Sequence, residues 1–558
     1  MQQEVLLRIL HPYFDSMRLS VLLALISCYT FQGFGQVDFT SSNLPIIILN
    51  SQGEPNDQSK IAASLSIIAN SQGQRNELTD PPSEYQGLCG LKIRGESSAT
   101  FPKKSYSIEM WSSLGQDIDT SFLGFPAEED FILYGPYSDK SLMNNVLVMH
   151  LAREMGQYAS KTEYVELVLN GSYEGLYVLM EKIKRDEGRV DISKLKAEDI
   201  EGDELTGGYI FRLDKGEHED WTSQQHIFDR PGRFVEYQYY YPPPEDLQPE
   251  QRVYIQEYMD AFEEAAVAED YHNSEGRHYT EYINLRSFVD NFILNELSKN
   301  VDAYRLSTYF HKDKESKGGR LNAGPVWDFN LAFGNADFCN VLSTSDWLYY
   351  DCVGNSPAWW DNFLQDETFR AALGCRYHTL RQGLLSNNSL SGQIDQWSRK
   401  ILEAQLRNYE RWDILGVYIW PNAGFYTWSD SHSILMSFYK DWIEERLAWL
   451  DENMPAESGD CARFDDPDFE VTGVSSTVDA QDNLVDLYPN PATTTLSIQS
   501  EENIEQLMIM DLTGRVVYQQ TMNSSSISVP FHLDQGAYLV RIQLNNTTLI
   551  KKLQVIAP

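Results

Sequence analysis

The chain has 558 residues, too many for one compact core, so we expect two or more domains. Its hydrophobic content of 42% and aromatic content of 12% are typical of an ordered globular protein. Against 82 acids stand only 44 lysines and arginines, and the net charge of −38 disfavours nucleic acid and anionic membranes as partners.

The start of the chain has the pattern of an export signal. Met17-Arg18 opens a short basic region before the apolar run Leu19–Ile26, and Gly33–Gly35 supplies the small residues that a signal peptidase prefers. We therefore predict a signal region over residues 1–35, with the signal peptide itself at 17–35. No later apolar run approaches the roughly 20 residues needed to span a bilayer, so we expect no transmembrane segment in the mature chain.

The cysteines do not have the spacing of a zinc site; they are Cys28, Cys89, Cys339, Cys352, Cys375 and Cys461. Signal cleavage would remove Cys28, and the odd number that remains leaves at least one thiol unpaired. In an oxidising compartment we expect some pairs, with Cys339 and Cys352 as the first candidates because both lie in one loop region. Cys28 also ends a Leu-Ile-Ser-Cys stretch that resembles a lipoprotein cleavage box, an alternative to ordinary cleavage.

Strand patterns dominate the first half of the chain. We predict two strands within 43–70, a strand, loop and strand over 89–111, a hairpin over 164–180 around Asn170-Gly171, and a strand at 207–215. One helix is expected at 139–155, capped by Ser138 or Asp139.

The loop at Arg94–Ser98 is the first candidate binding element. Its small residues would let backbone N–H groups approach phosphates, and Lys103 and Lys104 follow closely. The loop matches neither common glycine-rich phosphate motif. An ordinary hairpin with solvated lysines is the alternative.

Two acids, Asp302 and Asp328, flank a second predicted hairpin. An amphipathic helix at 284–300 leads into Asp302, and strands at 306–312 and 320–327 enclose a polar turn. Because the two arms are of similar length, the hairpin would bring both carboxylates to its open end. Converging carboxylates repel each other unless a cation lies between them. The alternative is that two unrelated acids flank a surface hairpin.

The second half of the chain changes character twice. From Trp359 to about Leu450 the pattern is helical and aromatic, and residues 463–483 are acidic and aperiodic, as in a linker. Residues 484–558 contain short alternating strands that predict a small β-sandwich.

Five segments, in this order, resemble the spore-coat CotH kinase family. They are LKIRGESSATFPKKSYSIEM, YVELVLNGSYEGLYVLMEKI, GGYIFRLDK, FVDNFILNELSKNVDAYRLSTYF and GPVWDFNLAFGN, and the resemblance covers roughly residues 43–450. It implies an α+β protein with an atypical two-lobed protein-kinase-like domain, which we place at 36–462.

The resemblance also implies roles for individual residues. Asp302 resembles the catalytic aspartate that orients or deprotonates the acceptor hydroxyl, and Asp328 resembles the metal-binding aspartate. The implied nucleotide-binding residues are Arg94, Gly95, Ser97 and Ser98 of the loop, Lys104 or else Lys103 on the phosphates, Glu181 at the adenine side, and Glu154 or else Asp139 as partner of the lysine. The implied cofactors are ATP and Mg²⁺, with Mn²⁺ as a substitute.

Two positions depart from the pattern of ordinary kinases. The asparagine that holds a second metal, five residues after the catalytic aspartate, is Ser307 here, and the second acid after the metal aspartate is Asn330. An amide oxygen still binds magnesium but adds no charge, so weaker metal binding or inactivity would be the consequence.

The C-terminal segment resembles the sorting domain of the type IX secretion system. The resemblance rests on YPNP at Tyr488–Pro491, on DLTGRVV from Asp511 and on the closing strands GAYLVRI and KKLQV. It implies the type IX machinery as a partner and a secreted or cell-surface location, and it argues against the lipoprotein alternative.

Three functions follow as hypotheses. The first is a secreted protein kinase that transfers the γ-phosphate of ATP to Ser or Thr hydroxyls of an extracytoplasmic protein. The second is a catalytically inactive kinase-like adhesin or scaffold. The third is a carbohydrate-binding protein that stacks sugars on Trp347, Trp359 and Trp360, although packing in a helical core is the alternative for these rings.

Overall fold

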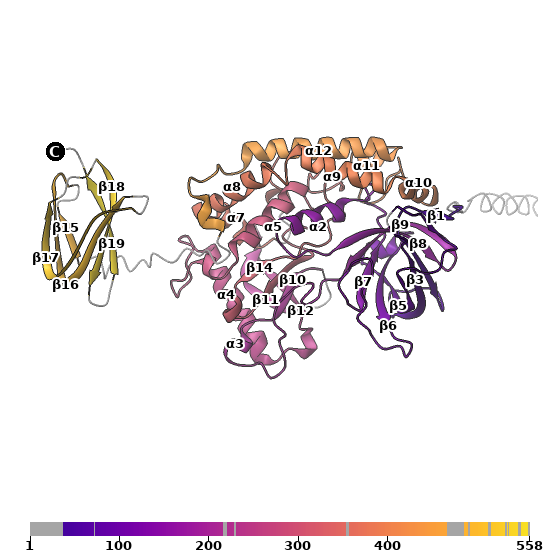
Figure 1. Cartoon of the computed structure of the whole chain (residues 1–558), viewed down its shortest axis with the longest axis horizontal. Coiled ribbons are helices and arrows are strands. Elements are labelled where there is room, and N and C mark those ends of the chain that lie inside the picture. The colour runs from indigo at the N-terminus through magenta and orange to yellow at the C-terminus, as the bar shows by residue number, and fades with distance from the viewer. Residues whose placement is uncertain are drawn as a thin grey trace, which may run out of the picture. The chain divides into compact units, whose positions relative to one another are not determined.

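The structure, a computed structural model, describes residues 37–555 apart from 72, 216–219, 228–229, 353–355, 466–484, 489–491, 512–514, 531–532, 534 and 545–547. It contains helices and sheets, which confirms the α+β class (Figure 1). The described chain divides into two compact units, and the C-terminal strands belong to the second. The predicted signal region and most of the predicted linker lie outside the described residues.

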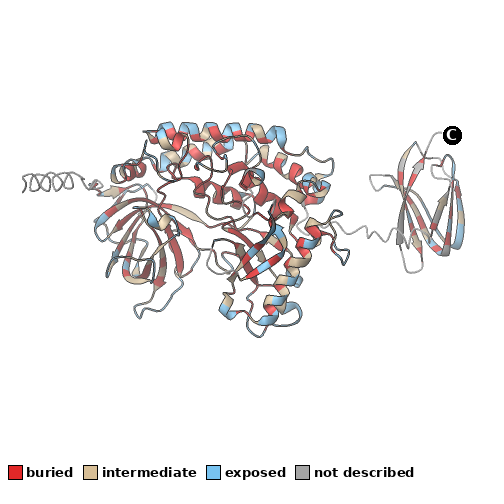
Figure 2. Ribbon diagram, turned by 180° about the vertical axis from the view of Figure 1, so that it is seen from behind, coloured by how far each residue is buried: buried red, intermediate tan, exposed pale blue. Residues whose placement is uncertain are grey.

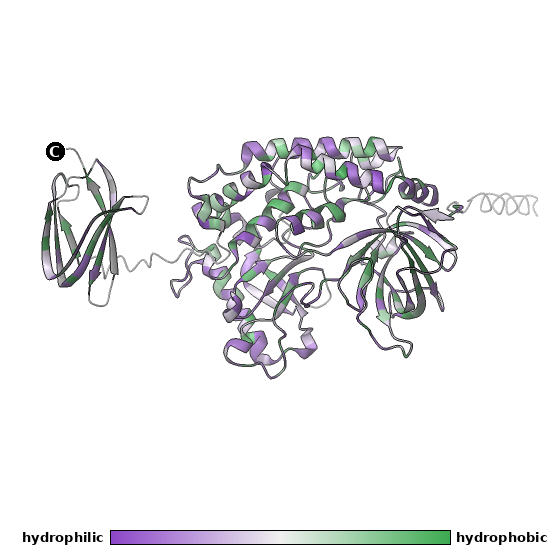
Figure 3. Ribbon diagram, in the orientation of Figure 1, coloured by the Kyte–Doolittle hydropathy of each residue, from purple (hydrophilic) through white to green (hydrophobic). Residues whose placement is uncertain are grey.

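Seven described strands close into a barrel in the order β2-β3-β5-β6-β7-β9-β8. They are β2 (Ile46–Ser51), β3 (Ile61–Ile68), β5 (Tyr85–Arg94), β6 (Ser105–Trp111), β7 (Asp130–Tyr134), β8 (Thr162–Leu169) and β9 (Ser172–Glu181), and a separate pair is formed by β1 (Ser41–Ser42) and β4 (Asn76–Glu77). The closing pair, β2 and β8, is parallel. Apolar side chains such as Leu65, Leu91 and Leu179 are buried in one cluster. Figure 3 shows hydrophobic residues along the strands of the barrel.

The predicted strands of this region are confirmed. Strands β8 and β9 form the predicted hairpin, and both turn residues, Asn170 and Gly171, have positive φ. Such turns match the twist of the flanking strands. Closure of the barrel was not predicted, because it depends on pairs between distant segments.

A second sheet has the order β11-β12-β10-β13-β14. Its strands are β10 (Tyr209–Leu213), β11 (Trp221–Ile227), β12 (Arg230–Tyr241), β13 (Thr308–Lys312) and β14 (Leu321–Ala323). The predicted hairpin is present, with Phe310 opposite Ala323. Its returning strand is only three residues long, since Pro325 has no N–H to donate to the ladder.

Helices cover the second sheet and form the rest of the first unit. The longer ones are α2 (Asn144–Glu154), α4 (Pro249–Val267), α5 (Leu285–Ser298), α8 (Glu367–Arg381), α9 (Asn387–Lys400), α10 (Leu402–Arg411) and α12 (His432–Asn453). The short ones are α3 (Gly202–Leu205), α6 (Leu348–Asp351), α7 (Trp359–Phe363) and α11 (Phe425–Trp428), with 3-10 turns at Ser98–Thr100, Pro244–Asp246, Tyr279–Glu281, Glu315–Lys317 and Cys461–Asp465. Figure 2 shows that α12 has one buried and one exposed side.

Helix α2 begins later than predicted. Its first residue is Asn144, and the preceding residue is Met143 rather than Ser138 or Asp139. Asp139 still contributes, because its carboxylate accepts the N–H of Asn144 at 3.0 Å. The Asp139 carboxylate therefore accepts a hydrogen bond from the first residue of α2, although Asp139 itself lies in the turn before the helix.

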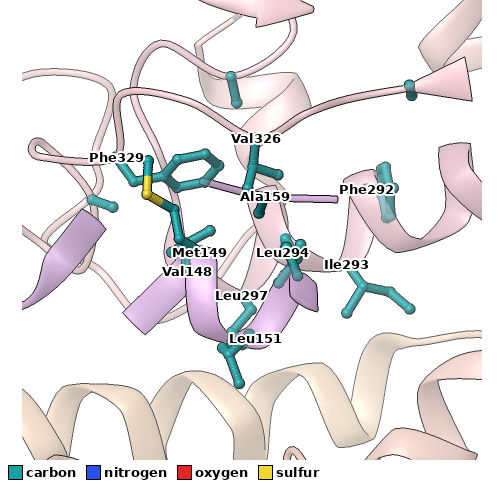
Figure 4. Packing of buried hydrophobic residues seen from close by; sticks show 14 of the residues in the cluster. Val148, Met149, Leu151, Ala159, Phe292, Ile293, Leu294, Leu297, Val326 and Phe329 are labelled. Carbon is teal, nitrogen blue, oxygen red and sulfur yellow. The ribbon is translucent and has the colours of Figure 1, made fainter. Parts of the chain in front are cut away.

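Helices α2 and α5 meet in the main core. Figure 4 shows Met149 of α2 and Leu294 of α5 beside Val326 and Phe329, which come from the segment after β14. This segment is therefore anchored to the core on either side of Trp327 and Asp328.

The tryptophans considered as sugar-stacking residues pack in the core. Trp359 and Trp360 are 0% and 1% exposed and contact Phe288 of α5. Trp347 packs on Phe292 and Trp449. The hypothesis that Trp359 and Trp360 stack on sugars is therefore wrong, and core packing is confirmed.

The disulfide prediction is confirmed. Cys339 is bonded to Cys352, and a second bond joins Cys375 to Cys461. The remaining described cysteine, Cys89, is buried in the barrel with a free thiol whose pKa burial raises to about 12.

The second unit contains β15 (Val485–Tyr488), β16 (Thr495–Asp511), β17 (Val516–Pro530), β18 (Gly536–Leu544) and β19 (Thr548–Val555). The long strand β16 pairs with β15, β17 and β18, and β18 pairs with β19. Parts of the predicted YPNP and DLTGRVV motifs lie outside the described residues.

Candidate active site

A cleft of about 360 Å³ is lined by residues from the barrel, from helix α2 and from the loops that contain Asp214, Asp302 and Asp328. The predicted site residues at this cleft are Arg94, Gly95, Ser97, Ser98, Asp302, Asp328 and Asn330. The structure thus brings together the predicted phosphate loop, the predicted catalytic acid and the predicted metal-binding residues.

Asp302 lies in the loop between α5 and β13. Residues Lys299, Tyr304 and Ser307 of this loop all have positive φ, a conformation that non-glycine residues adopt only when the surrounding structure holds them. The Arg305 guanidinium is 3.5 Å from the Asp302 carboxylate. Burial raises the pKa of Asp302, and the positive charges of Arg305 and Lys215 oppose that rise.

Glu296 of α5 holds this loop from inside the core. Its carboxylate accepts the Tyr304 hydroxyl at 3.0 Å and the backbone N–H groups of Leu348 and Tyr349 at 2.8 and 3.0 Å. Arg446 of α12 pairs with it at 3.2 Å, and both side chains are fully buried. The conformation of the Asp302 loop therefore depends on the buried ion pair of Glu296 and Arg446, in which both Glu296 oxygens have hydrogen-bond donors.

Asp328 also has a left-handed backbone, with φ +64°. The next residue is fixed by α2, since the N–H of Phe329 donates to Asn145 Oδ1 at 2.6 Å. Burial, together with the negative charge of Asp302, raises the pKa of Asp328 to about 7, and the Arg94 charge opposes the rise. The charges of Asp302 and Asp328 thus interact across the cleft.

Asn330 lies in the same segment after β14, two residues beyond Asp328. Its backbone oxygen accepts the side-chain amides of Asn144 at 3.2 Å and Asn335 at 2.9 Å. With the backbone held in this way, the Asn330 side chain lines the cleft. It is a candidate oxygen ligand beside Asp328.

The loop after β5 forms the barrel side of the cleft. The Arg94 guanidinium stacks over the Trp327 ring at 5.5 Å and is close enough to Asp328 to affect its pKa. Gly95 has φ +102°, and a Cβ there would lie 2.0 Å from Ser98 Oγ, so the turn requires glycine. Lys104 is outside the cleft lining and donates to the backbone oxygen of Ala99 at 2.7 Å.

Three other residues predicted to bind the nucleotide do not line the cleft: Lys103, Glu181 and Glu154. Lys103 is buried, and its ammonium donates to Leu176 O at 2.6 Å and Asn408 Oδ1 at 2.7 Å. Glu181 is buried at the end of β9, where it accepts the N–H of Lys161 at 2.8 Å. Lys103 thus links the barrel to α10, whereas Glu181 stabilises the chain just before β8.

Glu154 does not pair with a lysine near the cleft. It lies at the end of α2, its side chain is 57% exposed, and its neighbour is His150 at 4.0 Å. The alternative, Asp139, is buried in the turn before α2 and accepts the Ser141 N–H at 3.0 Å. Because α2 directs its first residues to the cleft, its last turn cannot supply the partner.

Sequence reasoning missed several lining residues, above all Asp214, Lys215 and Arg305. Asp214 and Lys215 follow the last residue of β10, and Arg305 follows Asp302 in the loop. An acid and a lysine at the end of the strand predicted over 207–215 were a usable signal. Only the pairing of β10 with β13, which the sequence did not reveal, places them beside the loop that carries Asp302.

The matches to family models agree with this geometry. A model described as CotH kinase protein matches residues 91–450, which include every cleft residue named above. The chain belongs to the CotH kinase family. Membership implies kinase-like use of a nucleotide and a metal in general terms. No curated protein gives a significant match.

The tail of this CotH family member matches a second model, described as a secretion system C-terminal sorting domain, over residues 486–556. This confirms the predicted resemblance. It points to the type IX secretion machinery and to a location at the cell surface or outside. Among the described residues, no helix is both long and apolar enough to cross a bilayer.

The donors in the CotH cleft fit a hard divalent cation. Asp302, Asp328 and Asp214 contribute carboxylates and Asn330 an amide, and these are the oxygen ligands that Mg²⁺ and Mn²⁺ prefer. Burial and the Asp302 charge raise the pKa of Asp328, and the Arg94 charge opposes this rise. A bound cation would stabilise the ionised form.

Proposed function

We propose that the protein is a secreted CotH-type kinase that transfers the γ-phosphate of ATP to Ser or Thr hydroxyls of an extracytoplasmic protein. The observation that carries the proposal is the convergence of Asp302 and Asp328 in one cleft with Arg94 and the Ser97–Ser98 loop. The cleft volume lies within the range of small-ligand sites.

In this proposal the domain at 36–462 has two lobes, as in protein kinases. The barrel would be the nucleotide-covering lobe, and the second sheet with its helices would be the lobe that carries the acids. The loop at 94–98 would then cover the phosphates, with Arg94 adding positive charge.

Asp328 and Asn330 would hold Mg²⁺ or Mn²⁺. When bound, the cation would neutralise phosphate charge that develops during transfer. Asp302 would orient the acceptor hydroxyl and take its proton, and Arg305 beside it favours the ionised carboxylate that this role requires. The conformation of its loop, fixed through Glu296 and Tyr304, would hold the base in place.

The test is transfer of labelled phosphate from γ-labelled ATP, with Mg²⁺ or Mn²⁺, to the protein itself and to dephosphorylated casein or myelin basic protein as acceptors. Asp302→Asn and Asp328→Asn are expected to lose at least about 100-fold in rate. Asp441→Asn, at an exposed position of α12, is the matched control and should retain full activity. Equal incorporation in all variants would instead support the inactive adhesin or scaffold.

A further inference from the structure

Strand β10 delivers a third acid to the cleft. Asp214 directly follows Leu213, the last residue of β10, and lines the cleft together with Asp302 and Asp328. Leu213 pairs with Thr308 of β13, so Asp214 lies beside the end of the loop that carries Asp302. Three carboxylates therefore line one cleft, whereas the proposed function gives roles to only two of them.

The Asp214 side chain is held in place by its neighbours. Its Oδ2 atom is 3.0 Å from Arg212 Nη1, and its Oδ1 atom accepts the Lys215 N–H at 2.8 Å. Arg212 is itself fixed, since it donates to the Tyr309 hydroxyl at 2.9 Å and stacks on Tyr240 at 5.5 Å. The group is therefore preorganised rather than free to turn away.

Asp214 still has acceptor capacity toward the cleft. An ionised carboxylate has about four lone-pair sites, and the contacts to Arg212 and Lys215 occupy one on each oxygen. Its side chain is 20% exposed. A cation in the cleft could therefore be bound without breaking the contacts that position the acid.

The usual protein ligand of a second magnesium is missing from the loop that carries Asp302. Ordinary protein kinases hold a second magnesium with an asparagine of the catalytic loop, and the corresponding position is Ser307, which lines the cleft with φ +47°. A serine hydroxyl is shorter than an asparagine side chain and carries no charge. The loop that contains Asp302 thus lacks the usual ligand for a second cation.

From these observations we infer that Asp214 replaces the missing asparagine and that the cleft binds two divalent cations with a nucleoside triphosphate. One cation is held by Asp328 and Asn330, and the other by Asp214. The inference rests on the proposed function for its nucleotide. Because a carboxylate replaces a neutral amide, the second cation is held by charge as well as by geometry.

The test counts bound Mn²⁺ by the electron paramagnetic resonance of the free ion. The full chain, saturated with the non-hydrolysable analogue AMP-PNP, is titrated with Mn²⁺, and the analogue alone is the blank. The natural chain should bind two ions. Asp214→Asn should keep one and bind the second about tenfold or more weakly. Asp441→Asn should bind two with natural affinities.

A second variant separates loss of the ligand from damage to the fold. Asn tolerates positive φ better than most residues, so Ser307→Asn can restore the usual ligand. The double variant Asp214→Asn with Ser307→Asn should regain the second ion, which a misfolded protein could not do. Thermal unfolding without metal confirms that each variant is folded.

Each other outcome has a distinct meaning. Two ions bound by Asp214→Asn with unchanged affinities would overturn the inference. A single ion in the natural chain would also overturn it, while the proposed kinase function would stand if labelled phosphate were still transferred. Loss of the second ion in Asp214→Asn, in a natural chain that transfers no phosphate, would support the inference and contradict the proposed function.

Discussion

Asn145, at the start of α2, accepts the N–H of Phe329 at 2.6 Å, directly after Asp328. The bond joins a helix of the first half of the chain to the segment that carries the predicted metal-binding acid. It fixes a backbone in which Asp328 has a positive φ. The position of Asp328 thus depends on a side chain that sequence reasoning had not selected.

The first prediction concerns this bond. In Asn145→Ala the buried N–H of Phe329 loses its partner, which should lower the free energy of unfolding by about 1–3 kcal/mol. Asp328 would also be less well positioned, so the affinity for Mn²⁺ should fall. Urea unfolding and Mn²⁺ titration check the two effects. Asn453→Ala, at the exposed end of α12, is the control and should change neither quantity.

The second prediction distinguishes the lysines. Lys215 lines the cleft and is exposed, so Lys215→Met should weaken AMP-PNP binding about tenfold, the effect of losing roughly 1.4 kcal/mol of phosphate attraction. Lys194→Met, also exposed, should bind the analogue normally. Equal affinities in a calorimetric titration would show that Lys215 does not face the phosphates.

The third prediction is that Lys103→Met, unlike Lys215→Met, lowers stability and leaves the affinity for AMP-PNP unchanged. The variant leaves the buried acceptors Leu176 O and Asn408 Oδ1 without their shared donor. We expect a loss of about 1–3 kcal/mol in the free energy of unfolding, with AMP-PNP affinity unchanged in the folded protein. A large loss of affinity at full stability would restore Lys103 as the phosphate lysine.

The fourth prediction concerns pH. Glu263 is buried in α4 and accepts from Tyr237 at 2.6 Å, and burial raises its pKa to about 7. Since the folded state holds a proton that the unfolded state releases from about pH 4.5, stability should decline as pH rises from about 4.5 to 7. The change should be a few kcal/mol in urea unfolding.

Glu263→Gln removes the titrating group and should flatten this part of the pH profile. Glu257→Gln, an exposed position on the same helix, should retain the slope. An identical slope in the natural chain and Glu263→Gln would assign the pH dependence to other groups.

The acids of the site could be predicted because their placement is local. Asp302 and Asp328 flank one hairpin, and Phe310 opposite Ala323 fixes its arms as the pattern indicated. The loop at Arg94–Ser98 could also be predicted, since it joins two neighbouring strands.

The remaining site residues depend on contacts between distant segments. Asp214 reaches the cleft only because β10 pairs with β13, and Asn145 only because α2 packs on the core beside Phe329. The misplaced predictions have the same origin. Lys103 turns to Asn408 of α10, and Glu154 lies on the last turn of a helix whose first turn faces the cleft. Residue type and spacing do not show which way the Lys103 and Glu154 side chains point in the folded protein.

The central claim is that Asp302 and Asp328 lie on opposite sides of the terminal phosphate of one bound nucleotide, with Asp328 as a ligand of its cation. The most direct measurement is the anomalous scattering of Mn²⁺ in crystals of the full chain grown with AMP-PNP. We predict a manganese peak within ligand distance of Asp328, with the terminal phosphate between the ion and Asp302. A nucleotide bound elsewhere, or manganese with no contact to Asp328, would contradict the account.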